Sequence, residues 1–379
     1  MLLYMSNATA YPIYDKLFRD GMIKSGYQMQ KFNHNLIEGL GKLTDVTSLS
    51  ALPYVNERAD RIDQTLDGIR YIAVKNNTGY IHKFSNLFYL YLEGSRIIKK
   101  YRPECIICDA IALSPCVISK LLGKRYNIPV IGIITDLPGM LGVENKATRK
   151  TVMRMQNFDG YILLTEQMNK IVNPNHRPYI IMEGLCASQL PELYLGKRRK
   201  VILYSGSLWK NDAGIEYLVQ GFINAKLSGY ELHLYGTGEL VPWIEEISKE
   251  HQNVKYMGCV TNSEMVKIQS DAMLLVNPRP SKEEFCKYSF PSKTIEYMAS
   301  GTPVLMTRLP GVPSEYFDYV YTIEDETSEG MCKTLEIVLS KEEKDLKEFG
   351  ASAREFVKEK KSQKWQSERV YKFIQEINK

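Results

Sequence analysis

The feature that most constrains the fold is the regular alternation of short apolar runs with amphipathic stretches along the chain. This pattern is typical of parallel strands joined by crossover helices. A first series of predicted strands covers residues 2–5, 69–74, 105–108, 130–134, 161–164 and 179–182. A second series covers residues 201–205, 231–235, 254–258, 273–276, 304–307 and 319–323. Two such series predict two doubly wound α/β domains that bind ligands at the carboxyl ends of their strands.

Length and composition agree with two folded domains. The 379 residues are 44% apolar and 25% charged, which excludes disordered and collagen-like chains. Periodicity lapses over residues 185–200, which we interpret as an interdomain linker. The last stretch, residues 341–379, reads as two charged amphipathic helices.

Cysteine usage and hydropathy predict a cytoplasmic protein. Seven scattered cysteines, an odd number, are not typical of a secreted disulfide framework. Cys105 and Cys108 form a CxxC, but it lies in an apolar run and has no second CxxC, so a buried strand is favoured over a metal site. Because no apolar window is long enough and no basic segment precedes the first apolar run, we expect neither a membrane span nor a signal peptide.

The segment 277–307 is the most informative for function. A polar loop follows a predicted strand, and a helix is expected to start near Phe290 with Pro291 in its first turn. Such a start offers backbone N–H groups to an anion. We interpret it as a diphosphate-binding site. Lys293 would neutralise the charge of the diphosphate, and Ser289 would either cap the helix or contact a phosphate oxygen. Glu296, about one turn further on, could accept hydrogen bonds from two ribose hydroxyls.

Residues 290–304, with the sequence FPSKTIEYMASGTPV, resemble the donor-binding helix of the family 4 glycosyltransferases, which are retaining enzymes of the GT-B fold. Residues 204–208 resemble the glycine loop of that family, and residues 235–239 and 254–260 are similar to its strand ends near the nucleobase. The resemblance covers about residues 200 to 325, with several motifs in the family's order.

The resemblance implies an α/β protein of the GT-B type, with two facing Rossmann-like domains. An acceptor-side domain (1–187) would precede a nucleotide-sugar-binding domain (188–361), and a C-terminal helix (362–379) would pack back on the first. The implied activity is transfer of a hexose or N-acetylhexosamine from a nucleotide sugar, most simply a UDP-sugar, to a glycan or lipid-linked saccharide, as in surface polysaccharide synthesis. No metal or other cofactor is expected. The implied catalytic residues are Asp136, Lys293 and Glu284, and the implied donor-binding residues are Gly206, Ser207, Lys210, Gly236, Val260, Arg279, Tyr288, Ser289, Phe290, Ser292 and Glu296.

Two departures from the family pattern bear on the donor sugar and the phosphates. Position 288 is Tyr where the family has a Glu that helps hold the donor sugar. Either Glu283 or Glu284 would then contact the sugar in place of that Glu, or the sugar would be recognised by other groups. Ser207 follows Gly206 where the family has Arg. Phosphate neutralisation would then depend on Lys293, Lys210 and Arg279.

In the N-terminal half, Asp136 follows an apolar strand, at the position where ligands meet an open α/β sheet. By resemblance it would face the donor sugar, although it could instead cap the turn at Leu137 and Pro138. Asn7 and Thr9, after the first strand, would line the same site or serve in a turn.

The positive charge lies in the N-terminal half. The formal net charge is +5, and residues 1–190 contain 23 Lys and Arg against 16 Asp and Glu. Basic residues on 143–155 and apolar ones on 84–92 suggest contact with an anionic membrane surface and a lipid-diphosphate-linked acceptor at the inner face of the cell membrane. A packed helix with a solvated basic side explains them equally well. Nucleic acid is not an expected partner.

Two other functions fit the same architecture. A nucleotide-sugar 2-epimerase would convert a UDP-sugar without an acceptor. A catalytically silent scaffold would bind a nucleotide sugar and neither hydrolyse nor transfer it.

Overall fold

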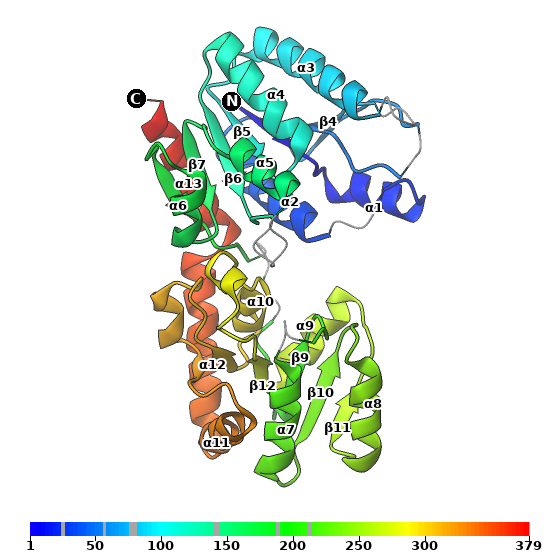
Figure 1. Ribbon diagram of the computed structural model, residues 1–379, viewed down its shortest axis with the longest axis vertical. Coiled ribbons are helices and arrows are strands. Elements are labelled where there is room, and N and C mark those ends of the chain that lie inside the picture. The colour runs from blue at the N-terminus through cyan, green and yellow to red at the C-terminus, as the bar shows by residue number, and fades with distance from the viewer. Residues whose placement is uncertain are drawn as a thin grey trace. The chain divides into compact units, whose positions relative to one another are not determined.

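The computed structural model describes residues 1–23, 27–55, 58–75, 82–138, 145–186, 190, 192–210 and 214–378. The chain divides into two compact units, each an α/β structure with its own sheet. Unit 1 comprises Met1–Leu185 and Gln363–Lys379, and unit 2 comprises Cys186–Ser362 (Figure 1).

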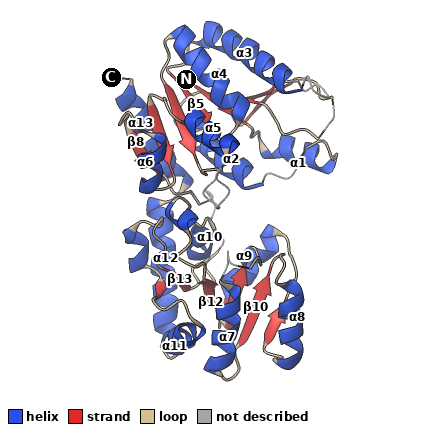
Figure 2. Cartoon of the chain, in the orientation of Figure 1, coloured by secondary structure: helices blue, strands red, loops and turns tan. Residues whose placement is uncertain are grey.

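Unit 1 contains, within its described residues, an eight-stranded sheet in the order β3-β4-β2-β1-β5-β6-β7-β8. All neighbouring strands are parallel except the β3–β4 pair. The strands are β1 (Leu2–Ser6), β2 (Val46–Ser50), β3 (Ile62–Leu66), β4 (Ile69–Ala73), β5 (Cys105–Asp109), β6 (Val130–Ile134), β7 (Gly160–Leu163) and β8 (Tyr179–Ile181). Helices cover the sheet (Figure 2): α1 (Tyr11–Arg19), α2 (Tyr27–Gly41), α3 (His82–Tyr101), α4 (Leu113–Tyr126), α5 (Lys146–Met155), α6 (Glu166–Val172) and α13 (Gln363–Ile377).

Strand β2 was not among the strands predicted from the sequence. Its residues include Thr47, Ser48 and Ser50, so it lacks the continuous apolar run of the other interior strands. It is nevertheless fully buried because it pairs with β1 on one side and β4 on the other. The Ser50 hydroxyl donates a hydrogen bond to the Ile72 carbonyl (3.3 Å). Position in the middle of the sheet therefore overrides polar composition.

Unit 2 contains a parallel sheet in the order β11-β10-β9-β12-β13-β14. Its strands are β9 (Arg199–Ser205), β10 (Glu231–Tyr235), β11 (Val254–Tyr256), β12 (Ala272–Asn277), β13 (Val304–Thr307) and β14 (Tyr321–Ile323). Its helices are α7 (Ile215–Ala225), α8 (Val241–Glu250), α9 (Asn262–Asp271), α10 (Lys293–Ala299), α11 (Ser328–Leu339) and α12 (Glu343–Lys360), with short 3-10 turns η2 (Glu284–Lys287) and η3 (Ser314–Asp318). Strand β11 ends earlier than the predicted 254–258 because Gly258 turns the chain with a φ of +70°.

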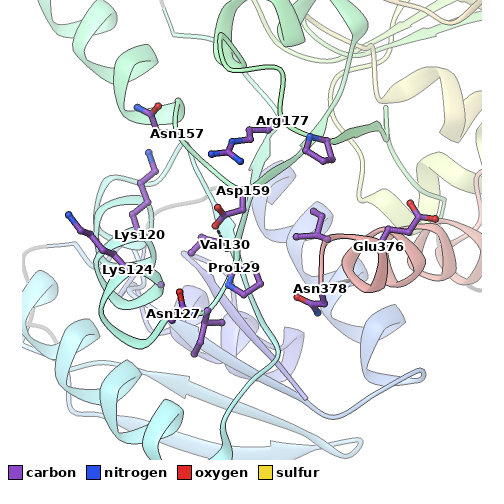
Figure 3. A pocket seen from close by; sticks show the side chains of 14 residues that line it. Lys120, Lys124, Asn127, Pro129, Val130, Asn157, Asp159, Arg177, Glu376 and Asn378 are labelled. Carbon is purple, nitrogen blue, oxygen red and sulfur yellow. Dashed lines mark hydrogen bonds between the residues drawn. The ribbon is translucent and has the colours of Figure 1, made fainter.

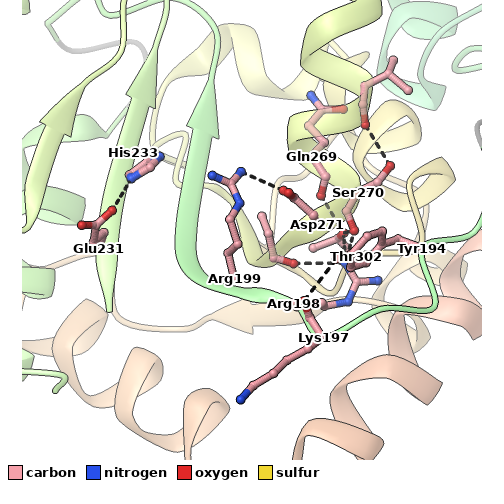
Figure 4. Close-up of polar contacts among 12 residues, drawn as sticks. Tyr194, Lys197, Arg198, Arg199, Glu231, His233, Gln269, Ser270, Asp271 and Thr302 are labelled. Carbon is pink, nitrogen blue, oxygen red and sulfur yellow. Dashed lines mark hydrogen bonds and ion pairs between the residues drawn. The ribbon is translucent and has the colours of Figure 1, made fainter. Parts of the chain in front are cut away.

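A buried arginine joins the strands of unit 2 at their amino ends. The guanidinium of Arg198, immediately before β9, donates to the carbonyls of Ala272 (3.0 Å) and Gly301 (2.8 Å) and to the carbonyl of Ser270 (Figure 4). It also contacts the hydroxyl of Thr302. One side chain thus satisfies carbonyl groups from the segments that lead into β12 and β13.

Each sheet has a point where the strand order reverses. In unit 1 it lies between β1 and β5, and in unit 2 between β9 and β12. Loops that leave the carboxyl ends of such strand pairs diverge to opposite sides and leave room for a ligand. We therefore expect the candidate site of unit 2 in the loops after β9 and β12.

Candidate functional site

Glycines bring the loops at the carboxyl edge of unit 2 into close contact. Gly206 follows β9 with a φ of +152°, and Gly236 follows β10 with a φ of +136°, values that favour glycine. A Cβ on Gly236 would lie 1.8 Å from the Gly206 carbonyl oxygen. The Gly206 N–H donates to the Tyr235 carbonyl (3.0 Å). A side chain at Gly236 would therefore force the two loops apart.

Lys293, the first residue of α10, reaches across to the Gly206 loop. Its Nζ donates to the hydroxyl of Tyr204 (3.0 Å) and lies 4.2 Å from the centre of that ring. The Tyr204 hydroxyl in turn donates to the carbonyl of Ser207 (2.6 Å). A Cβ on Gly206 would lie 2.2 Å from Lys293 Nζ, so the glycine is needed for this approach.

Burial and, to a smaller extent, the nearby charge of Arg279 lower the pKa of Lys293 to about 7, whereas Glu296 opposes the shift. An ammonium group that loses hydration without an adjacent anion favours its neutral form. The ion pairs found among the described residues do not include Lys293. The side chain is therefore placed where an incoming anion would restore its charge.

Helix α10 begins later than the sequence predicts. The expected start near Phe290 is wrong, because Ser292 is the residue that precedes the first helical residue, Lys293. Phe290 and Pro291 are instead buried ahead of the helix, and the Phe290 ring packs at 5.2 Å from that of Tyr316. The apolar anchor fixes the chain before the helix, and the Pro291 carbonyl accepts a hydrogen bond from the Thr294 N–H (2.8 Å) at its start.

Ser289 does not cap this helix, since it lies three residues before Ser292. Its hydroxyl accepts a hydrogen bond from Arg279 Nη1 (3.3 Å). The Arg279 guanidinium lies over the ring of Phe285, 5.0 Å from the ring centre. The loop after β12 thereby holds one cation beside the start of α10 on a hydroxyl and an aromatic face.

The acidic candidates lie at the surface of the same loop and helix. The Glu284 carboxylate accepts from Lys287 Nζ (2.7 Å) and from the Tyr288 hydroxyl (3.4 Å). The hydrogen bond with Lys287 is the main reason that the pKa of Glu284 is lowered. Glu296 is exposed on α10, one turn after Lys293. Tyr288 thus contacts Glu284 directly, which links the family departure at position 288 to a neighbouring carboxylate.

The remaining donor candidates lie in the segments after β9 and β11 and before α10. Ser207 and Lys210 are exposed, and the Lys210 N–H donates to Glu239 Oε1 (2.9 Å). Val260, after β11, has a side chain that is 37% exposed. Ser292 is exposed beside Lys293. The structure therefore brings Gly206, Gly236 and Lys293 into direct contact, and it connects Arg279 with Ser289 and Glu284 with Tyr288.

Asp136 lies in unit 1, just after β6. Its side chain is exposed, and its Oδ1 accepts from the adjacent Leu137 N–H (2.8 Å). This contact matches the alternative in which Asp136 caps a turn. Asn7 is exposed, whereas Thr9 is buried with its N–H donated to Gln30 Oε1 (3.0 Å). Thr9 therefore serves the turn after β1. Part of the expected basic stretch, residues 143 and 144, lies outside the described residues.

A buried carboxylate at the β1–β5 reversal was missed by sequence reasoning. Asp109, the last residue of β5, accepts from Asn33 Nδ2 (3.2 Å) and from the Ile111 N–H (3.1 Å). Asn33 Oδ1 accepts from the Tyr4 hydroxyl (2.7 Å). Burial raises the pKa of Asp109 to about 6. An acidic residue that ends an apolar strand was the available signal, but its partner Asn33 is distant in sequence.

An open pocket of about 770 Å³ lies at the opposite, amino edge of the unit 1 sheet (Figure 3). Its lining includes Lys120, Lys124, Asp159 and Arg177. Lys120 Nζ already donates to the carbonyls of Arg154 and Gln156, and Asp159 accepts from the Val130 N–H (2.8 Å). Lys120 and Asp159 therefore serve the local fold, and the pocket lies at the edge opposite to the carboxyl ends of the strands.

Within the described part of the chain, no three His, Cys, Asp or Glu side chains are grouped as metal ligands would be. Among the same residues, no helix is long and apolar enough to cross a bilayer.

Comparisons with known proteins relate these two units to glycosyltransferases. Residues 199–341 match the family described as "Glycosyl transferases group 1". A comparison with curated protein sequences gives no match. Sucrose-phosphate synthase from Thermosynechococcus elongatus is similar in structure over 100% of this chain and 99% of its own, with 16% identity and a TM-score of 0.70.

Two further solved structures match over nearly their whole length. The lipopolysaccharide outer core galactosyltransferase WaaB in its apo form has 15% identity and a TM-score of 0.65, with 99% of both chains covered. The Anabaena protein HepE in complex with UDP and glucose has 10% identity and a TM-score of 0.65, with 99% of this chain and 100% of that one covered. The expected fold is confirmed: the chain consists of two α/β units with parallel-strand sheets in the GT-B arrangement of secondary structure, and residues 199–341 of unit 2 match the glycosyl transferases group 1 family.

Proposed function

We propose that this chain is a retaining glycosyltransferase that moves a hexose or N-acetylhexosamine from a UDP-sugar to a hydroxyl group of a glycan or lipid-linked saccharide. The observation that carries the proposal is the contact of Lys293 with the Gly206 loop, at the point where the strand order of unit 2 reverses. A cation that is partly buried there and forms no ion pair among the described residues is suited to a diphosphate. The family match over residues 199–341 supports a nucleotide-sugar substrate.

The chemistry that these residues can perform is stabilisation of a leaving diphosphate. As the glycosidic bond to the donor breaks, negative charge develops on the departing phosphate, and positioned cations and N–H groups lower the energy of that charge. We assign this role to Lys293, Arg279 and the Gly206–Ser207 backbone, with Lys210 beside them. No residue is assigned as an enzyme nucleophile. In a front-face displacement the departing phosphate accepts the acceptor's proton, which retains the anomeric configuration.

Other roles follow from position. We propose that Glu296 accepts hydrogen bonds from the ribose and that Glu284, oriented by Tyr288, contacts the donor sugar. Val260 and Gly236 would border the nucleobase, and Ser289 and Ser292 would contact phosphate oxygens, with Phe290 fixing the loop that carries them. Asp136 would position the donor sugar or the acceptor. The proposed reaction requires no bound metal and takes place in the cytoplasm.

The experiment that tests the proposal is replacement of Lys293. We expect Lys293→Ala to reduce turnover of a UDP-sugar by about a hundredfold, since one group that stabilises developing charge contributes on this scale. The thermal unfolding temperature should change little. Transfer would be measured with radiolabelled UDP-sugars and a mixed glycan acceptor, and binding by calorimetry with UDP.

Lys249→Ala is the matched control, because Lys249 is an exposed lysine paired with Glu246 on α8. Unchanged turnover in Lys293→Ala would remove the phosphate assignment. Conversion of a UDP-sugar to an isomer without an acceptor would indicate an epimerase. Binding of UDP-sugars without transfer or hydrolysis would indicate a scaffold.

A further inference from the structure

The outward face of helix α4 has an apolar stripe. Leu113, Val117 and Leu121 recur at every fourth residue, and their side chains are 42%, 38% and 49% exposed. Residues four apart lie on the same side of a helix, so these three form one strip. The opposite side of α4 is buried through residues such as Ile118 and Leu122. The stripe is therefore additional to the core-facing side of this helix.

Helices α3 and α5 pack on the two flanks of α4. On the α3 side, a Cβ on Gly94 would lie 2.5 Å from Leu122 Cδ1. On the α5 side, Cys116 Sγ donates to the Arg154 carbonyl (3.3 Å). Figures 1 and 2 show the three helices over the same face of the unit 1 sheet. Their outward sides form a single surface.

The flanking helices extend the apolar area. Phe88 of α3 is 57% exposed, and Met153 of α5 is 67% exposed. We call these two side chains and the α4 stripe, together with the exposed basic residues of the three helices, the α3–α5 face. This outcome differs from the sequence expectation, which took the apolar residues from 84–92 and the basic residues from 143–155 and did not include α4.

The charge of the same helices is strongly positive. Helices α3, α4 and α5 contain eleven Lys and Arg residues and one acidic residue, Glu93, whereas the whole chain has a net charge of +5. Glu93 is buried and pairs with Arg61 (3.2 Å) and Arg96 (2.8 Å). Exposed basic residues come from all three helices: Lys99, Lys100, Lys124, Arg125, Arg149 and Lys150.

We propose that the α3–α5 face docks on the headgroup layer of an anionic lipid bilayer, with the α4 stripe entering that layer. Apolar side chains on a helix that lies in the interface gain from burial among acyl chains, while surrounding Lys and Arg bind anionic headgroups. A nucleic acid would also attract the cations. Its phosphate backbone would leave the aliphatic stripe without an apolar partner, so the combination favours a bilayer. The proposal does not depend on the catalytic function.

One consequence does rest on the proposed function. Helix α4 begins with Leu113, four residues after the last residue of β5, Asp109, so the stripe starts near the carboxyl edge of the unit 1 sheet. Docking through the α3–α5 face would hold the carboxyl edge of the unit 1 sheet beside the lipid headgroups. A lipid-linked saccharide acceptor would then be presented to unit 1 from the membrane surface.

Flotation of the full chain with vesicles tests the docking. Vesicles of phosphatidylcholine alone and of phosphatidylcholine with phosphatidylglycerol would be compared. We expect flotation only with the anionic vesicles. The Val117→Gln/Leu121→Gln variant tests the apolar stripe of α4. The Phe88→Gln/Met153→Gln variant tests the apolar side chains of α3 and α5 without changing α4. The Arg149→Glu/Lys150→Glu variant tests the positive charge. Each should lower the bound fraction at limiting lipid by about tenfold or more.

Ile337→Gln/Lys249→Glu is the matched control, since both residues are exposed on helices of unit 2, and it should float like the wild type. Circular dichroism and UDP binding should be unchanged in every variant, which separates lost docking from lost folding or lost donor binding. Absence of flotation of the wild-type chain with anionic vesicles overturns the proposal, whether or not the chain then binds a nucleic acid duplex. Loss in the charge variant alone, with both apolar variants floating normally, also overturns it.

Discussion

Under the proposed function, the side chain of Lys293 should couple donor binding to pH. Its pKa of about 7 in the free protein means that it is largely neutral at pH 8. A bound diphosphate favours the charged form, so binding above pH 7 should take up about one proton, and affinity should fall as pH rises. Calorimetry with a UDP-sugar at pH 8, in buffers of different ionisation enthalpy, measures this uptake. Lys293→Met should abolish it, and equal proton uptake in wild type and variant would refute the assignment.

The buried carboxyl of Asp109 makes a separate pH prediction, for stability. Its pKa of about 6 lies above the value of an exposed Asp, near 3.8, so the folded state holds the proton more tightly than the unfolded state. The stability contributed by this group is present below pH 4 and is lost as pH rises to 6. Relative to Asp109→Asn, the wild type should lose about 2 kcal/mol between pH 4 and pH 7. Urea unfolding at both pH values measures the difference, and a constant difference would contradict the shift.

Sequence reasoning at the residue scale found the groups that are close together along the chain. Lys293, Ser289 and Arg279 lie within one segment, so spacing alone placed them near one another, and the structure joins Arg279 with Ser289. The approach of Lys293 to Gly206 required the glycine loop as well. Asp109 meets Asn33 of α2 only because β1 and β5 are neighbours, and no local pattern encodes that contact.

At the scale of elements, apolar runs predicted most interior strands, and the failures have physical causes. Strand β2 is buried through its place between β1 and β4 despite the hydroxyls of Thr47 and Ser48. Helix α10 starts at Lys293 because Phe290 is anchored in an aromatic cluster before it. The exposed stripe of α4 uses the same residue types as a core-facing side. Only the packed structure shows which side of that helix faces solvent.

The amino ends of β12 and β13 depend on Arg198. Arg198→Met should destabilise unit 2 by about 3 kcal/mol, since it leaves the carbonyls of Ala272, Gly301 and Ser270 without their charged donor. Arg199→Met is the control, because Arg199 forms only a half-exposed pair with Asp271 (2.8 Å) and should contribute less than about 1 kcal/mol. Denaturant unfolding of both variants gives the comparison. Equal effects would show that the buried network is not important for stability.

At the scale of the molecule, the chain crosses from unit 1 to unit 2 and returns. Helix α13 follows α12 of unit 2 but belongs to unit 1, where it packs on α2. Gln363 Nε2 donates to the Asn35 carbonyl (2.9 Å), and Gln366 Nε2 donates to the Gly184 carbonyl (2.8 Å). Amphipathic periodicity predicted a helix here, and its polar and apolar contacts place it in unit 1. Unit 1 is therefore completed by residues that follow unit 2 in the chain.

Removal of residues 363–379 should consequently unfold unit 1 rather than trim its surface. Val370, Phe373 and Ile374 are buried in the unit 1 core, and burial of each contributes about 1.5 to 3 kcal/mol. The loss of about 5 kcal/mol or more is comparable to the whole stability of a typical domain. Limited proteolysis should then cleave within residues 1–185 while unit 2 stays protected, because α13 makes no part of the unit 2 core. A truncation that removes only Asn378 and Lys379 should resist proteolysis like the intact chain, and equal resistance of the longer truncation would show that α13 is dispensable for folding of unit 1.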